Sequence, residues 1–518
     1  MSDEPSASPT RESYADELVA AGFSDDGHRL RGAVRWADAD GIPRDTKIEI
    51  IIDDRFPFAP PIVRIIDSDR SLDLTFHVER PEADVPEGVS GNLCLWENDW
   101  AVDRAPWRTP AALLARVAGW LDETAAGWPG DEACDLERYL PRASDALVLY
   151  RSDQLAGVDR AARQVEPGPN GTVAVTDRLA RTTPKNRTRP RRKDAASAWV
   201  EDVGQLTRPL TCWEDVQAVL GDPEAVRRAV ADRSVGYLLL RYGRGNSTSV
   251  LVTRVKYDGA EIAVEACESA DEAPEALELR AGPAAVSLRD TSVAVIGCGA
   301  VGSFVADLLY RSGVRDMGLF DPERLRPGNV VRHLGTLDDV GQLKVHVVQN
   351  RLRRVAGDIS EVHAYGYSIV DLAQARKLVS TYDIVLDATA NPRATSLLAA
   401  AAQERLGQGA ATVLSVCVQR KGDVVRVDRM PVHDGETYLP PLEWLDDTPV
   451  LADAGCGSPV AVTPPGAVLA AARLAAEVVS AEAAEPGRTP ASIVEVSRPQ
   501  PEPEFQVVGR MTSPPAAR

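Results

Sequence analysis

The chain has 518 residues, more than one hydrophobic core usually organises, so we expect several domains. Apolar residues make up 44% and charged residues 26%, which excludes a wholly disordered or fibrous chain. The 58 basic and 77 acidic residues give a net charge of −19. That charge argues against a protein that coats nucleic acid or anionic lipid along its whole length, and we expect no specific nucleic-acid partner.

The chain shows no membrane or export signal. The most apolar stretch, residues 467–479, is interrupted by Arg473 and Glu477 and is too short for a membrane helix. The acidic N-terminus lacks the layout of a signal peptide, so we expect a cytoplasmic protein without disulfides. Its seven cysteines include no C-x-x-C pair, so a four-thiolate zinc site lacks its usual spacing.

Residues 1–150 are predicted to form an α+β domain. A short helix is expected at residues 12–21. Strands rich in β-branched residues follow at residues 32–36, 46–53 and 61–67 and indicate an antiparallel meander. Thr109 is predicted to cap a second helix, because Pro110 suits its first turn and apolar residues then recur on one face.

Residues 151–196 are predicted to be a linker. Residues 178–193 hold eight basic residues, no acidic ones and two prolines, a composition typical of an exposed spacer. Residues 197–285 are interpreted as a small middle module with a helical stretch at 213–229 and a hairpin formed by 236–241 and 249–256.

Residues 286–497 are predicted to form an α/β Rossmann-like domain. Strands are expected at residues 292–296, 316–321 and 383–388 and near Val362, with helices between them, including one at 343–355. This alternation favours a parallel sheet with helices on both faces. The proline-rich tail, residues 498–518, is predicted to be disordered.

A glycine-rich motif marks a nucleotide site in this domain. VAVIGCGAVGSF places Gly297, Gly299 and Gly302 between an apolar strand and a helix, where phosphate can approach the helix N-terminus. Asp321 follows Gly302 by 19 residues and can accept hydrogen bonds from a ribose, as in NAD-binding proteins. Arg332 and Lys344 favour ATP instead, because fixed cations stabilise departing pyrophosphate, although an ordinary solvated helix face is the alternative.

These motifs resemble the ThiF/MoeB/HesA adenylyltransferases, which share their fold with ubiquitin-activating enzymes. The resemblance covers about residues 286–485. It implies that the three glycines form the nucleotide loop and that Asp321 binds the ribose. It also implies that Asn329, Arg332 and Lys344 contact phosphates.

The resemblance also implies a magnesium ligand. DIVLDATAN resembles the family's D-x-T-D-N segment, but Ala390 replaces the aspartate that helps to bind Mg²⁺. Asp387 is the nearest carboxylate and is predicted to hold the metal directly or through water.

Two cysteines are candidate acyl carriers. Cys456 lies in the loop DAGCGSP, and in activating enzymes of this resemblance such a loop carries the catalytic cysteine. A cysteine thiolate converts an acyl adenylate into a thioester. An inert loop cysteine is the alternative for Cys456, whereas Cys417 is interpreted as a core residue. Cys298 fits the glycine loop merely as a small residue.

The order of elements in residues 11–145 resembles the ubiquitin-conjugating fold, and Cys94 in GNLCLW matches its thioester cysteine. A buried strand cysteine is the alternative. The family's His-Pro-Asn tripeptide is absent, since Val78 and Glu79 follow His77. Another donor must therefore stabilise the oxyanion, with Asn92 and Asn98 as candidates, and His77 is either catalytic or structural.

The whole arrangement resembles the fused conjugating and activating enzymes of bacterial anti-phage operons, notably CBASS. That resemblance implies a homodimer that activates the C-terminus of a ubiquitin-like carrier or a nucleotidyltransferase with ATP. The acyl group would pass through Cys456 and Cys94 to a target amine. The alternatives are a sulfur-carrier adenylyltransferase, a non-catalytic scaffold and, least favoured, an NAD-dependent oxidoreductase.

Overall fold

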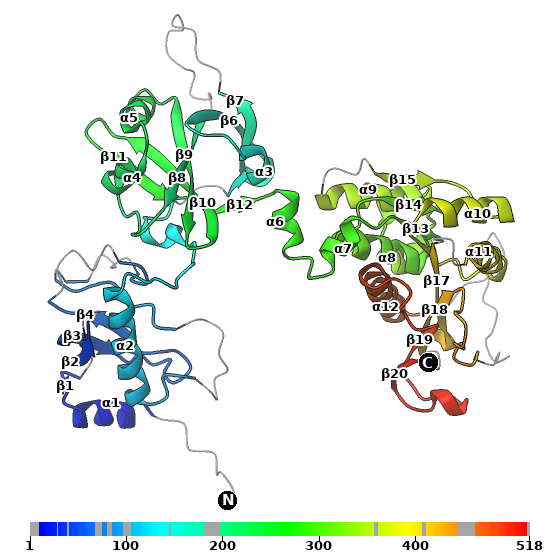
Figure 1. The fold of residues 1–518 in the computed structure, drawn as a ribbon, viewed down its shortest axis with the longest axis horizontal. Coiled ribbons are helices and arrows are strands. Elements are labelled where there is room, and N and C mark those ends of the chain that lie inside the picture. Colours follow the sequence, from blue (N-terminus) through cyan, green and yellow to red (C-terminus); the bar gives the residue numbers. More distant parts are fainter. Residues whose placement is uncertain are drawn as a thin grey trace, which may run out of the picture. The chain divides into compact units, whose positions relative to one another are not determined.

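The structure is a computed structural model of the chain. It describes residues 10–27, 29–38, 41–67, 75–79, 85–86, 88–96, 105–143, 147–180, 197–356, 361–406, 411–442 and 462–514. The chain divides into two compact units, Met1–Ala273 and Pro274–Arg518 (Figure 1). No helix in the described ranges has both the length and the apolarity to cross a membrane.

The first unit begins with a helix and a four-stranded antiparallel sheet. The helix α1 (Arg11–Ala20) starts at Thr10, whose hydroxyl accepts from the Ser13 amide. The strands, in the order β1-β2-β3-β4, are β1 (Ser24–Asp25), β2 (Leu30–Ala37), β3 (Pro43–Ile51) and β4 (Ile62–Ile65). This confirms the meander predicted from the sequence.

The helix α2 (Pro110–Ala125) packs on this sheet (Figure 1). As predicted, it begins at Thr109, whose hydroxyl accepts from the Ala112 amide, with Pro110 in the first turn. Its buried face is formed by Leu113, Val117, Trp120 and Leu121. These residues share one apolar cluster with Ile48, Ile50 and Trp107, which holds the helix to the strands.

The rest of the first unit is an eight-stranded sheet with the order β11-β10-β9-β8-β6-β7-β5-β12. Its strands are β5 (Val148–Tyr150), β6 (Ala161–Pro167), β7 (Val173–Leu179), β8 (Ser197–Gln205), β9 (Val235–Arg244), β10 (Ser247–Tyr257), β11 (Ile262–Ala266) and β12 (Ser269–Asp271). Its helices are α3 (Ser152–Leu155), α4 (Trp213–Val219) and α5 (Pro223–Ala231), with short 3-10 turns η3 (Leu136–Tyr139) and η4 (Pro169–Gly171).

This sheet corrects two predictions. β6 and β7 lie in the range 151–196 that was predicted to be a linker, and that prediction was wrong for them. Both strands lie inside the sheet, between β8 and β5, but their polar sequences bury only single anchors such as Val165 and Val175, so the basic run beside them dominated the pattern. The predicted helical stretch at 213–229 is two helices, because Asp222 caps α5 and a proline follows it. The predicted hairpin is confirmed as β9 and β10.

The second unit contains another eight-stranded sheet, with the order β15-β14-β13-β16-β17-β18-β19-β20. The strands are β13 (Val293–Ile296), β14 (Met317–Phe320), β15 (Val362–Tyr365), β16 (Ile384–Asp387), β17 (Thr412–Gln419), β18 (Val424–Met430), β19 (Ser492–Val496) and β20 (Gly509–Thr512). Pairing is parallel from β15 to β17, which confirms the predicted parallel strands. Pairing is antiparallel from β17 to β20, so the whole sheet is mixed.

Helices cover both faces of the parallel strands, as predicted. The helices of this unit are α6 (Pro274–Glu278), α7 (Ala285–Arg289), α8 (Ala300–Arg311), α9 (Lys344–Ala356), α10 (Leu372–Thr381), α11 (Pro392–Glu404) and α12 (Pro465–Ala484), with 3-10 turns η5 (Pro327–Arg332), η6 (Leu337–Asp339), η7 (Arg420–Gly422) and η8 (Pro503–Phe505). Along β13, Val293 and Val295 join the cluster with α8 and α12, whereas Ala294 and Ile296 join the cluster with α10 and α11. Alternate side chains of this strand therefore face opposite layers.

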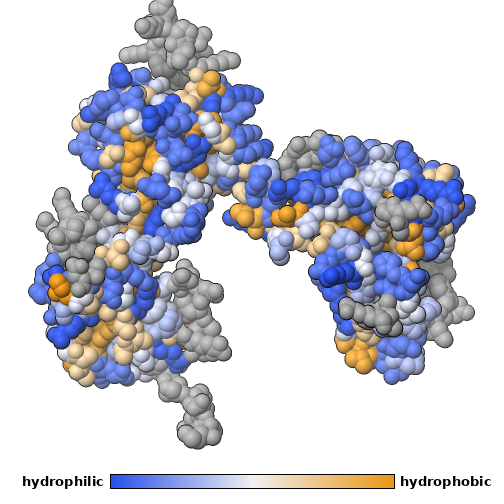
Figure 2. Space-filling view, viewed as in Figure 1, coloured by the Kyte–Doolittle hydropathy of each residue, from blue (hydrophilic) through white to orange (hydrophobic). Residues whose placement is uncertain are grey.

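The described part of the C-terminal segment, residues 498–514, includes the strand β20, so the prediction of a disordered tail was wrong for these residues. β20 pairs with β19, and Phe505 is fully buried against Val494 and Val496. The proline-rich composition around Phe505 is typical of a disordered segment, so the sequence did not reveal that this residue is buried. Figure 2 shows a largely hydrophilic surface with apolar patches, and among the exposed apolar residues are Leu279 and Val286, which are 86% and 72% exposed.

Candidate functional site

A cavity of about 430 Å³ lies at the carboxyl ends of the parallel strands in the second unit. Its lining includes the loop from β13 to α8, the residues that follow β14 and β16, and part of β17. Such a position, beside the N-terminus of the twelve-residue helix α8, is where open α/β sheets bind nucleotides.

The three predicted glycines have different roles in this loop. Gly297 has a φ of +88°, which favours glycine, and a Cβ there would lie 3.0 Å from the backbone of Thr389. Gly299 lines the cavity, and a Cβ there would meet nothing within 4 Å. Gly302 is buried in the first turn of α8 and lets the helix approach the loop. The structure therefore leaves open space where the motif predicted phosphate.

Asp321 lies after β14 and lines the same cavity. Its carboxylate accepts from the backbone amide of Cys298 at 2.9 Å and from that of Glu323 at 2.7 Å. Burial raises the pKa of Asp321, although these amides and Lys344 oppose the shift. Asp321 thus holds the glycine loop as well as facing the space predicted for a ribose.

Two cations predicted from distant positions meet at this cavity. Lys344, the first residue of α9, is only 7% exposed, and its Nζ lies 2.5 Å from Oε2 of Glu323. The hydrogen bond and the charge of Lys344 lower the pKa of Glu323. Arg332, the last residue of η5, also lines the cavity. The cavity therefore combines a glycine loop, two cations and two acidic residues, Asp321 and Glu323.

Asn329 is not part of the cavity lining. Its Oδ1 accepts from the backbone amide of Arg326 at 3.0 Å, which closes the turn at the start of η5. The structure therefore gives Asn329 a place in the turn that carries Arg332, and its predicted phosphate contact has no support in this geometry.

Asp387 does not fit the predicted role of a direct magnesium ligand. It is 1% exposed and is absent from the cavity lining. Its oxygens accept from the Thr389 hydroxyl at 2.6 Å and from the Thr395 hydroxyl at 2.5 Å. A metal would have to displace these hydroxyls. Ala390 lines the cavity without a carboxylate, and the described residues contain no cluster of three or more His, Cys, Asp or Glu side chains suited to a metal.

The predicted cysteine Cys456 lies outside the described residues. Thr463, seven positions further along the chain, lines the cavity. Cys417 on β17 also lines it, so it is not simply a core residue, and burial raises its pKa to about 11. Burial also raises the pKa of Cys298, which is buried in the glycine loop.

The second candidate centre surrounds Cys94 in the first unit. Cys94 is half-buried, and its backbone amide donates to the carbonyl of His77 at 2.8 Å, which places the two residues next to each other. Nε2 of His77 donates to Oδ2 of Asp131 at 2.8 Å. Nη2 of Arg138 lies 3.5 Å from Sγ of Cys94. The structure thus joins a thiol, an imidazole, a carboxylate and a guanidinium.

This environment shifts the pKa values of the thiol and the imidazole in opposite directions. The hydrogen bond with His77 lowers the pKa of Cys94 against the effect of burial, and Arg138 contributes to the lowering. Burial alone would lower the pKa of His77, but the hydrogen bonds to Cys94 and Asp131 raise it overall. The thiolate and imidazolium forms therefore stabilise each other.

Sequence reasoning missed Asp131 and Arg138, because both follow α2 at positions without a motif. Asn92, one of the two asparagines considered as oxyanion donors, forms hydrogen bonds with other side chains. Oδ1 of Asn92 accepts from Arg64 at 2.8 Å, and its Nδ2 donates to Glu79 at 3.1 Å. Asn98 lies outside the described residues.

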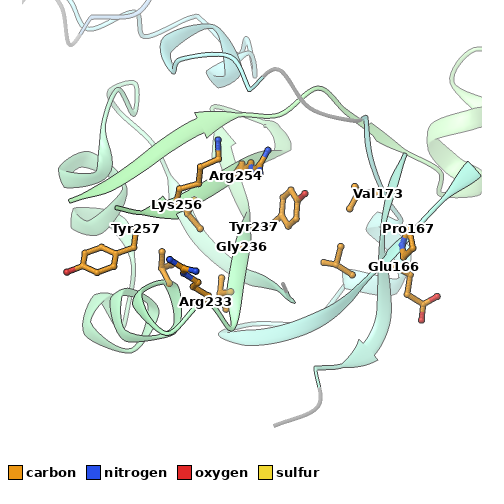
Figure 3. A pocket seen from close by; sticks show the side chains of 13 residues that line it. Glu166, Pro167, Val173, Arg233, Gly236, Tyr237, Arg254, Lys256 and Tyr257 are labelled. Carbon is orange, nitrogen blue, oxygen red and sulfur yellow. The ribbon is translucent and has the colours of Figure 1, made fainter. Parts of the chain in front are cut away.

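A second cavity, of about 610 Å³, lies in the eight-stranded sheet of the first unit. Figure 3 shows Arg233, Arg254 and Lys256 around the side that holds Tyr237, whereas Glu166 lies on the opposite side. None of the residues predicted as functional lines this cavity.

Comparison with known proteins finds similarity in the second unit. Residues 277–475 match the model of the ThiF family. Over 122 residues the chain is 33% identical to the ATP-dependent ubiquitin transferase-like protein Cap2 of Enterobacter hormaechei, a match that covers 23% of this chain and 20% of that protein. It is also 33% identical over 128 residues to ubiquitin-like modifier-activating enzyme 5 of Drosophila ananassae, covering 23% of this chain and 32% of that one.

Among solved structures, Escherichia coli MccB with ATP is 18% identical, with a TM-score of 0.34 and coverage of 45% of this chain and 66% of that one. The matches to the two relatives span only about a fifth and a third of their lengths. The family match and the two relatives confirm the resemblance to ThiF-type, ubiquitin-activating-like proteins that the nucleotide motifs indicated.

Proposed function

Because residues 277–475 match the ThiF family, we propose that this chain is an ATP-dependent adenylyltransferase that activates a protein's C-terminal carboxylate. The carboxylate then becomes a thioester on Cys456, passes to Cys94 and is ligated to a target amine. The observation that carries the proposal is the cavity in which the glycine loop, Arg332 and Lys344 meet.

In the first step a carboxylate oxygen attacks the α-phosphorus of ATP. A new P–O bond forms, the bond to the β-phosphate oxygen breaks, and pyrophosphate leaves. Arg332 and Lys344 stabilise the charge that builds on the leaving group, while Asp321 orients the ribose. Lys344 is suited to this role because it is buried, lines the cavity and is held in place by its ion pair with Glu323.

Mg²⁺ would supply further charge neutralisation for the phosphates. The described carboxylates do not form a site that holds this ion through the protein alone. Magnesium in nucleotide enzymes usually keeps several waters and is held by one or two carboxylates together with the substrate phosphates. We therefore expect Mg²⁺ to arrive with ATP.

In the next two steps the acyl group moves between sulfurs. The thiolate of Cys456 attacks the acyl adenylate and AMP leaves; the thiolate of Cys94 then attacks that thioester and frees Cys456. Two observations support Cys94 as the second carrier. It is half-buried rather than sealed in a core, and its surroundings favour the thiolate.

We further propose that residues 11–145 have a ubiquitin-conjugating-like fold. The order of α1, an antiparallel meander, the cysteine segment and α2 supports this assignment. The carrier would be a ubiquitin-like protein or a nucleotidyltransferase C-terminus, and the setting anti-phage defence. A homodimer is supported by three exposed apolar residues in the segment 331–340, namely Val331, Leu337 and Val340.

Pyrophosphate exchange tests the activation step. The full chain is mixed with ATP, Mg²⁺, labelled pyrophosphate and a candidate carrier that has a free C-terminus. We expect exchange that requires the carrier's terminal carboxylate and disappears when that carboxylate is amidated. Absence of exchange with every carrier encoded beside this chain would favour a non-catalytic scaffold.

Intact-mass analysis tests the transfer. Cys94→Ser is expected to trap the carrier as an ester on residue 94, whereas Cys456→Ala is expected to prevent loading while leaving pyrophosphate exchange intact. If Cys94→Ala still completed conjugation, the relay through Cys94 would be wrong. If the carrier adenylate formed without any thioester, the sulfur-carrier alternative would be favoured.

A further inference from the structure

The geometry around Cys94 points to a catalytic relay that replaces the missing His-Pro-Asn device. We propose that His77 takes the proton from the amine that attacks the Cys94 thioester, and that Asp131 and Arg244 position His77 for this task. This inference rests on the proposed role of Cys94 as an acyl carrier.

The imidazole is fixed on three sides. Nε2 of His77 donates to Asp131 at 2.8 Å, and the ring lies 4.1 Å from the ring of Trp128. On the third side lies the thiol of Cys94, whose interaction with the ring raises the pKa of the imidazole. A histidine between a sulfur and a carboxylate has the arrangement of an oriented general base.

The backbone of His77 is held in a left-handed conformation that residues other than glycine rarely adopt. Its φ is +64°. Its amide donates to the hydroxyl of Tyr139 at 2.9 Å, and its carbonyl accepts from the amide of Cys94 at 2.8 Å. A left-handed histidine costs free energy, and such costs persist where the surrounding structure enforces a geometry. Here the enforced geometry brings the imidazole to the thiol.

The carboxylate is fixed by a residue from β9. Arg244 is 4% exposed, and its Nη2 lies 2.6 Å from Oδ2 of Asp131 and 3.2 Å from the carbonyl oxygen of Asp131. Its guanidinium carbon lies 3.3 Å from the centre of the Phe76 ring, the residue before His77. Arg244 thus contacts Asp131, the hydrogen-bond partner of His77, and also Phe76, which precedes His77 in the chain.

The charged groups around the thiol favour this assignment. Among the described residues they are His77, Asp131, Arg138 and Arg244, with Asp135 and Glu79 paired to Arg138. Arg138 is closest to the sulfur, at 3.5 Å, and Tyr139 stays a neutral phenol because burial raises its pKa to about 12. Glu79 and Asp135 form ion pairs with Arg138, and its Nη2 atom still contacts the sulfur of Cys94.

The proton movements balance in both half-reactions. Before loading, the proton of Cys94 resides on His77, and the thiolate attacks the incoming thioester. Once Cys94 is acylated its sulfur is neutral, so the pKa of His77 falls and the imidazole releases its proton. In the second half, the amine nitrogen bonds to the acyl carbon, the C–S bond breaks, and His77 accepts the amine proton. Arg138 stabilises the departing thiolate of Cys94.

Alkylation of Cys94 by iodoacetamide tests the relay without ATP or a carrier. The full chain is labelled at pH 5 to 10, and the rate at Cys94 is read by peptide mapping. We expect a half-maximal rate below the ordinary cysteine pKa of about 8.5. His77→Gln should move that midpoint up by at least one pH unit, and Asp131→Asn and Arg244→Met should move it in the same direction by less.

A matched control comes from the same strand. Arg241 on β9 donates to the carbonyl of Leu155, away from the centre, so Arg241→Met should leave the midpoint unchanged. If His77→Gln and Arg244→Met both kept the wild-type midpoint, the relay would be wrong, whatever the outcome of the conjugation assay. Far-ultraviolet circular dichroism identifies any variant that fails to fold, and Arg244→Lys then replaces Arg244→Met.

Single-turnover aminolysis measures the proposed chemistry itself. The Cys94 thioester is formed, ATP is removed, and lysine is added at pH 6 to 9. We expect His77→Gln to reduce the rate at pH 7 by about 10² or more, the usual size for general-base catalysis. If no thioester forms from ATP, the proposed function fails while the alkylation profile still reports on the relay.

Discussion

A Cβ placed on Gly302 would lie 1.8 Å from the carbonyl oxygen of Gly297. Helix α8 therefore starts so close to the β13 strand end that only a residue without a side chain fits at this position. The same approach brings the amides of the helix N-terminus to the cavity.

Gly302→Ala is expected to displace the glycine loop and to abolish ATP binding. Forcing a methyl group into a filled site costs about 1–3 kcal/mol, and the neighbouring atom here is backbone that cannot rotate away. Gly299→Ala is the matched control for stability, because a Cβ there meets nothing within 4 Å. Nucleotide titration and thermal unfolding measure both variants; normal ATP affinity in Gly302→Ala would contradict this account.

Lys344→Ala is expected to lower the rate of pyrophosphate exchange by about 10²–10³, the usual effect of losing one group that stabilises developing charge. Glu323→Gln keeps the cation and removes only its partner, so its effect should be less than tenfold. Pyrophosphate-exchange kinetics at saturating ATP distinguish the loss of the cation in Lys344→Ala from the loss of its partner in Glu323→Gln. An equal loss in both variants would mean that the ion pair, rather than the cation, is required.

The described cysteines should differ sharply in reactivity. The pKa of Cys94 is lowered by His77, whereas burial raises that of Cys417 to about 11. The thiolate fraction of Cys417 at pH 7 is then on the order of 10⁻⁴. We expect iodoacetamide at pH 7 to modify Cys94 and to spare Cys417, with Cys417 reacting only as the pH rises toward 11. Peptide mapping that found equal rates would refute the assignment of Cys94 as the activated thiol.

Glu49 is expected to stabilise the first sheet. It is 1% exposed and accepts from both Arg29 and Arg31, at 3.1 and 3.0 Å. Glu49→Ala should cost roughly 1–3 kcal/mol, because buried hydrogen bonds to charged groups are lost. Asp45→Ala breaks only the exposed pair with Arg35 and should change stability by less than about 1 kcal/mol.

Urea unfolding followed by tryptophan fluorescence measures both variants, since eight of the nine tryptophans precede residue 274. A similar midpoint for Glu49→Ala and Asp45→Ala would show that the burial of Glu49 adds nothing.

The sequence identified the parts of the nucleotide cavity that depend on local spacing. The glycine loop follows a strand and precedes a helix, so Gly297 and Gly299 could be placed from the pattern alone. Lys344 was found because it belongs to the same family motif. For Asp387 the sequence left direct and water-mediated metal binding open, since the spacing that puts it at a strand end does not reveal that Thr389 and Thr395 donate to its oxygens.

The centre around Cys94 could be predicted only in part. Cys94 and His77 were recognised, but Asp131 is 54 residues from His77, and Arg244 is 113 residues from Asp131. No periodicity links positions so far apart, because tertiary packing alone brings them together. The linker prediction failed for the same reason, since β6 and β7 are stabilised by neighbours in a sheet rather than by their own composition.

The ion pair between Arg244 and Asp131 constrains two segments of the chain to evolve together. A genetic exchange that swapped the leading α+β segment alone would separate the acid from the arginine that holds it, so the strand that bears the arginine has to travel with its partner. Substitutions at either position should accordingly be tolerated in descendants only when the other changes to suit it.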